Sequence, residues 1–248
     1  MTFKRCSMKL KIMLELQHIS YTVSENGRQK TILQDISLQI GDKQNVVITG
    51  QNGSGKSTLV KIIMGIIQPT SGKILFNGED ITNLSITERA RKGIAFGFQQ
   101  PVTFKGLKVK DLFKIILNQN FDCNECCTYL SQVGLCAKDY INRPLDTKLS
   151  GGELKRIEIA TVLARQAKLN IFDEPEAGID LWSFDNLVNI FQNQTATNII
   201  ISHQHKIILI ADKVVLLNSA KIDKIGTPNE VIQFIDANKK CARLRGDK

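Results

Sequence analysis

The 248-residue chain lacks any apolar run long enough to cross a bilayer. Its longest apolar stretches, such as 198–201 and 206–211, fall far short of the roughly 20 residues that a membrane helix needs. It also lacks the continuous apolar core of a secretory leader, since residues 1–13 carry four basic side chains. We therefore expect a cytoplasmic protein without a membrane-inserted segment, in which residues 1–13 form a disordered extension.

Recognition motifs for nucleic acid are also missing, and so are internal repeats and low-complexity tracts. The chain is basic, with 33 Lys and Arg against 24 Asp and Glu and a net charge of +9, which favours a polyanionic partner or ligand. These basic residues are spread along the chain, so we do not expect nucleic-acid binding. With 42% hydrophobic residues, the chain can fill the core of one large domain or two small ones.

Cysteines are few, at six, and a chain without a leader is expected to keep them as reduced thiols. Four of them cluster at Cys123, Cys126, Cys127 and Cys136. Because no second Cys-x2-Cys pair follows at the spacing of a zinc site, we interpret the cluster as free thiols. A labile metal or iron–sulfur contact is the alternative.

The N-terminal part shows two kinds of strand pattern. Apolar and polar residues alternate from Leu14 to Ile40 and are broken by Glu25-Asn26-Gly27, which predicts two half-buried antiparallel strands joined by a turn. Val46-Val47-Ile48-Thr49 is a continuous run typical of a strand buried on both faces. A glycine-rich turn follows, and the apolar segment 57–67 then predicts a buried helix.

The remainder divides into a helical middle and a second strand-rich part. Helical patterns cover 109–119, 126–133 and 154–167, and strands then return at 169–172, 198–201 and 213–217, with helices at 181–192 and 205–211 between them. Such alternation predicts parallel strands with crossover helices.

We therefore predict an α/β fold in a single domain, residues 1–248. Its mostly parallel core sheet is joined to an antiparallel N-terminal β-subdomain and a helical subdomain. The expected boundaries are 14–99 and 166–237 for the core, 100–165 for the helical subdomain and 238–248 for a basic tail.

A phosphate-binding loop is predicted where the buried strand meets the helix. Residues 50–57 read Gly-Gln-Asn-Gly-Ser-Gly-Lys-Ser and match the pattern G-x-x-x-x-G-K-[ST] in the expected context. Glycines let backbone N–H groups surround a phosphate, the lysine supplies a positive charge, and the serine hydroxyl can bind Mg²⁺. The candidate ligand-binding residues are Gly50, Asn52, Gly53, Ser54, Gly55, Lys56, Ser57 and Thr58.

A second acidic site is expected at the end of strand 169–172, in Asp173 and Glu174. Asp173 would help to bind Mg²⁺, and Glu174 would polarise the attacking water. Two adjacent acidic residues are weak evidence for a catalytic site by themselves. The predicted phosphate-binding loop at residues 50–57 strengthens this interpretation. Asn170 is an unusual residue for a strand that is expected to be buried.

Leu149-Ser150-Gly151-Gly152-Glu153 resembles the signature motif of ATP-binding cassette (ABC) ATPases. The resemblance covers nearly the whole chain and implies a P-loop NTPase fold of the ABC ATPase type that hydrolyses ATP with Mg²⁺. It also implies that Ser150, Gly151 and Gly152 close over the nucleotide bound by a second subunit, in an ATP-dependent head-to-tail homodimer.

The same resemblance assigns roles to four further residues. Tyr21 would stack on adenine, Gln99 would sense Mg²⁺ and the γ-phosphate, Asp180 would belong to the D-loop, and His203 would be the switch histidine. Each has a structural alternative. Tyr21 would be a half-buried strand residue, Gln99 a loop amide, Asp180 a helix N-cap, and His203 a cap or core residue.

Within the ABC ATPases, three segments resemble SufC-type proteins of iron–sulfur cluster assembly: Phe98–Pro101, Leu149–Glu158 and Asp173–Asp180. This likeness implies a SufB-like scaffold as the partner, or a pair of SufB-like and SufD-like scaffolds. The alternative is the ATPase subunit of an ABC transporter, whose membrane partner would dock near Gln99. We expect the partner surface within residues 100–148, and a pairing of Lys155 with Glu174 in the idle monomer.

Overall fold

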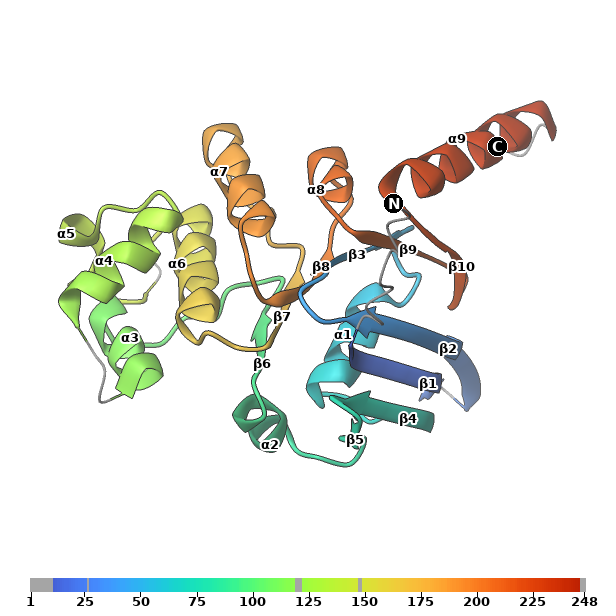
Figure 1. Cartoon of the computed structure of the whole chain (residues 1–248), viewed down its shortest axis with the longest axis horizontal. Coiled ribbons are helices and arrows are strands. Elements are labelled where there is room, and N and C mark those ends of the chain that lie inside the picture. Colours follow the sequence, from blue (N-terminus) through green and yellow to red (C-terminus); the bar gives the residue numbers. More distant parts are fainter. Residues whose placement is uncertain (1–10, 26, 119–121, 147–148, 246–248) are drawn as a thin grey trace, which may run out of the picture.

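The computed structural model describes residues 11–25, 27–118, 122–146 and 149–245. They form two sheets with helices packed around them (Figure 1). The smaller sheet is antiparallel in the order β2-β1-β4-β5, and its strands are β1 (Ile12–Glu25), β2 (Arg28–Gly41), β4 (Ser71–Phe76) and β5 (Glu79–Asp80). It is the predicted β-subdomain.

The larger sheet has the order β10-β9-β3-β8-β7-β6. Its strands are β3 (Asn45–Gly50), β6 (Ile94–Gly97), β7 (Leu169–Asp173), β8 (Thr197–Ile201), β9 (Lys213–Asn218) and β10 (Lys221–Gly226). All neighbours pair in parallel except β10, which is antiparallel at the edge. The predicted α/β fold with a mostly parallel core sheet is confirmed.

The helices are α1 (Lys56–Met64), α2 (Ile86–Arg91), α3 (Val109–Leu117), α4 (Cys123–Gln132), α5 (Ala137–Tyr140), α6 (Gly151–Ala164), α7 (Leu181–Gln192), α8 (His205–Leu209) and α9 (Pro228–Arg245). Helices α3 to α6 gather at one end of the molecule, away from the antiparallel sheet (Figure 1). Within the described ranges, no helix is both long and apolar enough to cross a membrane.

The two ends of the chain differ from expectation. Strand β1 takes in the last two residues of the expected extension 1–13, and residues 1–10 lie outside the described residues. Helix α9 continues past 238, where the sequence predicts a basic tail, and reaches Arg245. Residues 239–245 are mainly lysine, arginine, alanine and leucine, which have high helix propensity and continue the helix.

Alternation along the core strands divides the interior into two hydrophobic clusters. On β3, Val46 and Ile48 face the cluster shared with α1 and the antiparallel sheet, whereas Val47 faces the cluster shared with α6 and the other helices. Successive strand residues point to opposite faces, so one short apolar run supports both cores. This double burial explains why the parallel strands read as continuous apolar segments.

A row of three hydrogen-bonded asparagines explains why the polar residue Asn170 is tolerated in a buried strand. Asn170, Asn198 and Asn45 are in register on β7, β8 and β3. The Nδ2 of Asn170 donates to Asn198 Oδ1 at 3.1 Å, and the Nδ2 of Asn198 donates to Asn45 Oδ1 at 2.7 Å. Asn45 Nδ2 then donates to the Phe191 carbonyl at 3.0 Å. This row lies at the amino ends of the strands, so it leaves the carboxyl ends for the site described next.

Candidate functional site

The carboxyl ends of four adjacent parallel strands carry most of the residues that the sequence singles out. Strand β3 leads to the loop at 50–57, β6 to Gln99, β7 to Asp173 and Glu174, and β8 to His203. Because parallel strands end at the same edge of a sheet, these groups lie near one another although up to 153 residues separate them.

The loop between β3 and α1 packs too closely against its neighbours for side chains at two of its glycines. A Cβ on Gly50, at φ +145°, would lie 1.9 Å from the Leu217 carbonyl oxygen. A Cβ on Gly55, at φ +98°, would lie 2.7 Å from Leu33 Cδ2. Glycine is therefore required where the backbone passes over β9 and β2. The result is a backbone nest that opens at the N-terminus of α1.

Lys56 spans this loop from the first turn of α1. Its side chain is 5% exposed, and its Nζ donates to the carbonyls of Gly50 and Gln51 at 2.9 Å each. Burial lowers the pKa of Lys56, whereas the charges of Glu174 and Asp173 oppose that shift. Ser54 Oγ is also buried here and has no hydrogen-bond partner among the described residues. An ammonium, an unpaired hydroxyl and helix N–H groups suit a polyphosphate.

Two acidic residues adjoin the start of α1. Ser57 Oγ donates to Asp173 Oδ1 at 3.1 Å, and Asp173 is 1% exposed. Burial raises the pKa of Asp173, the hydrogen bond from Ser57 opposes this, and the Glu174 charge raises it further. A hydroxyl beside a carboxylate is a donor set that Mg²⁺ accepts, and one or two protein ligands suit a Mg²⁺ that also binds phosphate.

Glu174 has a left-handed backbone, with φ +48°. That conformation costs on the order of 1 kcal/mol for a residue other than glycine. Its Oε2 accepts a hydrogen bond from Gln99 Nε2 at 2.8 Å. The strained turn therefore places the carboxylate beside the β6 loop, next to the Ser57–Asp173 pair.

His203 follows β8 and borders the loop from another side. Burial lowers the pKa of His203, the nearby Lys56 charge adds to this shift, and Glu174 opposes it. The imidazole also lines a cavity of about 830 Å³ together with Gly50, Gln51 and Asn52. At neutral pH the ring is therefore neutral and can accept or donate a hydrogen bond.

Tyr21 lies close to the loop but within a strand. It is half-buried on β1, where its pairing partner on β2 is Leu33. Leu33 in turn contacts the loop at Gly55. Tyr21 is thus one strand away from the phosphate-binding loop, a position compatible both with a stacking role and with the structural alternative.

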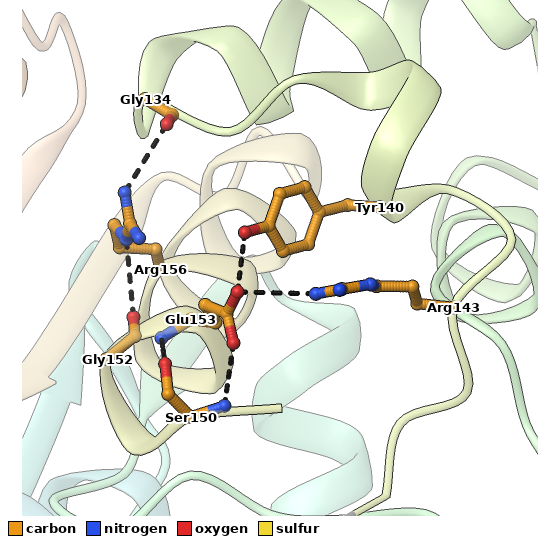
Figure 2. Close-up of polar contacts among 7 residues, drawn as sticks. All are labelled: Gly134, Tyr140, Arg143, Ser150, Gly152, Glu153 and Arg156. Atoms are coloured by element: carbon orange, nitrogen blue, oxygen red, sulfur yellow. Dashed lines mark hydrogen bonds and ion pairs between the residues drawn. The ribbon is translucent and has the colours of Figure 1, made fainter. Parts of the chain in front are cut away.

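The signature residues form a separate group at the N-terminus of α6 (Figure 2). Ser150 Oγ accepts from Glu153 N at 3.2 Å and caps the helix. A Cβ on Gly152 would lie 2.6 Å from the Gly178 carbonyl oxygen, so the signature packs on the turn that precedes Asp180. Asp180 caps α7, where its Oδ1 accepts from Ser183 N at 2.9 Å.

Lys155 does not pair with Glu174, contrary to expectation. Its Nζ lies 3.2 Å from Glu158 Oε2 and donates to the Phe98 carbonyl, while Glu158 Oε1 accepts from Phe98 N at 2.9 Å. The expectation was wrong because the side chain is 1% exposed and points from α6 into the protein. Lys155 and Glu158 hold the backbone next to Gln99, a role that their spacing of three on a helix could have suggested.

Glu176 is a further residue that the sequence analysis left without a role. Ser202 Oγ donates to its Oε1 at 2.5 Å, whereas its buried Oε2 has no partner among the described residues. Burial raises the pKa of Glu176, and the bond from Ser202 opposes that shift. Glu176 therefore joins the turn after Glu174 to the residue before His203.

This buried carboxyl predicts a pH-dependent stability. Ionised Glu176 is a cost to the folded state that is fully present above its raised pKa and absent below the ordinary value of 4.5. The melting temperature of Glu176→Gln minus that of the wild type should therefore become more positive from pH 5 to pH 9, by roughly 3 °C. Thermal melts of both proteins, with the exposed Glu125→Gln as a control, measure this difference. A difference that does not change with pH would contradict the prediction.

The clustered cysteines lie in and around α4. Cys126 is buried in the hydrophobic cluster, Cys127 is half-buried and Cys136 is exposed at the start of α5. The side chain of Cys123 lies outside the described residues. Across the described part of the chain, no three His, Cys, Asp or Glu side chains gather as a metal site.

Comparisons with known proteins agree with this geometry. The family model described as ABC transporter matches residues 33–177, from the second strand to the turn after Glu174. The chain belongs to the ABC transporter family. It is an ATP-binding protein and an ATPase, with the α/β fold of ABC cassettes.

Two relatives and one solved structure show the extent of the similarity. The chain is 36% identical to an uncharacterized ABC transporter ATP-binding protein of Methanocaldococcus jannaschii, over 86% of this chain and 89% of that protein. It is 32% identical to the energy-coupling factor transporter ATP-binding protein EcfA2 of Caldanaerobacter subterraneus, over 89% and 81%. A dimeric ATP-binding cassette with ADP and Pi has the same fold, with TM-score 0.80, 21% identity and coverage of 87% and 99%.

Proposed function

We propose that this protein is the ATP-hydrolysing subunit of a transporter, working at the cytoplasmic face of a separate membrane partner. The observation that carries the proposal is the convergence of Lys56, Ser57, Asp173, Glu174 and His203 at one sheet edge. The names of the relatives, which are ATP-binding proteins of transporters, support the choice of partner.

Nucleotide binding follows from the loop at 50–57. Lys56 would exchange its two carbonyl contacts for the β- and γ-phosphates, and Ser54 Oγ would gain its missing partner. Tyr21 would stack on adenine from β1. Ser57 and Asp173, together with Gln99, would hold Mg²⁺, which when bound offsets the charge that develops on the phosphates.

Hydrolysis is assigned to the groups around Glu174. Its carboxylate accepts a proton from the attacking water as the water oxygen bonds to the γ-phosphorus and ADP leaves. Gln99 orients this carboxylate through the 2.8 Å hydrogen bond. The neutral His203 donates a hydrogen bond towards the γ-phosphate, where charge accumulates.

The signature and D-loop residues complete the site in a second copy of the chain. Ser150, Gly151 and Gly152 lie at the N-terminus of the 14-residue helix α6, which attracts a phosphate. Within this chain, Gly152 instead packs against the Gly178 turn. We therefore infer an ATP-dependent head-to-tail homodimer, with Asp180 at the interface. The dimeric state of the structural neighbour agrees with this arrangement.

Lys56→Ala is expected to weaken ATP binding about 100-fold, because a buried cation next to the phosphates contributes several kcal/mol. Titration with a fluorescent ATP analogue measures the dissociation constant. Lys73→Ala, which removes an exposed lysine of β4 outside the loop, is the control and should bind normally. Unchanged ATP affinity of Lys56→Ala would remove the lysine from the site.

An apolar groove offers the partner a place next to the nucleotide. A cavity of about 600 Å³ lies between α2 and β6 on one side and α3 and α6 on the other. Its lining includes large hydrophobic side chains that remain 37–66% exposed: Ile66, Ile86, Phe98, Val102, Phe104 and Ile115. Phe98 directly precedes Gln99, whose side chain bonds Glu174. A partner helix that contacts Phe98 in this groove would therefore be one residue away from the hydrolytic site.

A SufC-like role with a SufB-like or SufD-like scaffold is the second candidate. Residues that carry this resemblance have specific buried contacts here, since Lys155 holds the Phe98 carbonyl and Glu176 accepts from Ser202. The first contact fixes the residue before Gln99, and the second joins the turn after Glu174 to the residue before His203. The same ATPase cycle would then drive a soluble partner in the assembly of iron–sulfur clusters.

Crosslinking from the groove distinguishes the two partners. A photoreactive residue at Val102, in the full chain expressed in its native host, should crosslink to a protein with several membrane spans. The same residue at Ile225, an exposed hydrophobic position on β10, is the control and should not. Crosslinking to a soluble protein that carries iron and sulfide would instead support the scaffold role and contradict the transporter.

A further inference from the structure

Glu153 connects the signature end of α6 to a different helix (Figure 2). Its Oε2 accepts from Ser150 N at 2.7 Å, while its Oε1 accepts from Tyr140 Oη at 2.5 Å and from Arg143 Nη1 at 3.3 Å. Tyr140 is the last residue of α5, and Arg143 lies in the turn after it. The guanidinium of Arg143 also lies 4.9 Å from the centre of the Tyr140 ring.

A helix cap does not require these two partners. Ser150 and Glu153 form a complete capping box by themselves, since each side chain bonds the backbone of the other. Tyr140 and Arg143 come 13 and 10 residues earlier and bond the Glu153 carboxylate rather than the backbone of the cap. The capping box holds only the Oε2 of Glu153. The bonds from Tyr140 and Arg143 also hold Oε1, so the carboxylate cannot turn towards the ligand side.

Arg156 holds the signature residues from the side opposite to Tyr140 and Arg143 (Figure 2). Arg156 Nε donates to the Gly152 carbonyl at 3.4 Å, and its Nη1 donates to the Gly134 carbonyl at 3.3 Å. Gly152 packs against Gly178, whereas a Cβ on Gly151 would have no heavy atom within 4 Å. Ser150 and Gly151 are both exposed, so this side of the signature is open to a ligand.

The negative charge of Glu153 at the N-terminus of α6 makes the direction of its side chain important for ligand binding. A carboxylate in the first turn repels a triphosphate that approaches the same helix end. The hydrogen bond from Tyr140, followed by that from Ser150 N, lowers the pKa of Glu153 to about 2, so the group is ionised at neutral pH. The hydrogen bonds from Tyr140 and Arg143 hold the Glu153 carboxylate away from the ligand side. The positive charge of Arg143 also offsets the negative charge of Glu153.

We propose that Tyr140 and Arg143 are positioning residues for ATP-dependent dimerisation. Through Glu153 they orient Ser150 and Gly151 so that this helix end meets the nucleotide bound by the other copy. The inference rests on the proposed head-to-tail dimer. It also connects α5, within the segment where a partner is expected to dock, to the signature.

The test uses Glu174→Gln as the parent protein, in which ATP should persist. Tyr140→Phe and Arg143→Gln are added to it singly, and dimer dissociation constants with ATP are measured by analytical ultracentrifugation. Each variant should weaken the dimer about tenfold, the loss expected for one hydrogen bond to a charged group. Affinity of the monomer for a fluorescent ATP analogue should stay unchanged, because Lys56 and Ser57 are untouched. Arg143→Lys, which keeps the charge, should recover part of the dimer affinity.

Tyr129→Phe is the matched control, since Tyr129 Oη bonds Gln166 Nε2 at 2.9 Å on another side of the helical part. A parent that stays monomeric with ATP would overturn the proposed dimer itself. A parent that dimerises, with variants that dimerise equally well, would overturn only the positioning role. Variants that melt earlier but keep the parent's dimer affinity would do the same, since a purely structural contact behaves in that way. Tyr140→Phe removes one oxygen atom, so it keeps the test valid if Arg143→Gln fails to fold.

Discussion

Glu174→Gln is expected to lower ATP turnover about a thousandfold, because glutamine cannot take the proton that the attacking water loses. The amide has nearly the same shape and can still accept the hydrogen bond from Gln99, which is 2.8 Å long in the wild type. Lys56 and Ser57 are unchanged, so ATP should still bind. The variant should therefore accumulate as an ATP-bound dimer.

Phosphate release and size-exclusion chromatography with and without ATP measure the two effects separately. Glu125→Gln, an exposed glutamate of α4, makes the same chemical change away from the site and should leave both unchanged. If Glu174→Gln stayed monomeric with ATP and kept full turnover, neither the proton acceptor nor the dimer would be assigned correctly.

Arg89→Met is expected to destabilise the fold by about 4 kcal/mol, since it leaves several buried carbonyls without a donor. Arg89 is 0% exposed. Its Nη1 donates to the Ile62 and Ile63 carbonyls at 2.7 and 2.8 Å, its Nη2 to the Thr82 carbonyl at 2.6 Å, and its Nε to the Leu84 carbonyl at 3.0 Å. The first two lie at the C-terminal end of α1, where a cation is also favoured by the helix dipole.

Thermal melts should show a melting temperature roughly 10 °C below that of the wild type. Arg91→Met is the control, because Arg91 is exposed on the same short helix. Arg89→Lys should be intermediate, since one ammonium cannot reach all four carbonyls. A loss of stability no larger than that of Arg91→Met would show that water satisfies those carbonyls instead.

Parts of the fold and site could be predicted because their signal is local. The loop at 50–57 combines a motif with a preceding apolar strand and a following helix, so a short stretch contains the whole pattern. The long strands β1 and β2 alternate over many residues. Strand β6 has only four residues, Ile94–Gly97, and is extended because it pairs with β7, whose partner residues are 75 positions away.

Buried polar contacts form the part that sequence reasoning missed or misassigned. Lys155 follows the signature, and its charge suggested a carboxylate partner at Glu174. It instead points into the protein, where Glu158 and the Phe98 carbonyl compensate its burial. Glu176 and Arg89 are ordinary charged residues in the sequence, and only the packing of distant segments removes them from water.

The sequence by itself determined that this protein has a phosphate-binding loop and the signature of an ABC ATPase, because both depend on glycines and polar groups at fixed local spacing. The tertiary structure decided which charges meet. It brings Gln99 to Glu174, Ser57 to Asp173, and Tyr140 with Arg143 to Glu153. The physical reason is that such pairings depend on strand order and helix packing, which arise from burial of two apolar cores across the whole chain.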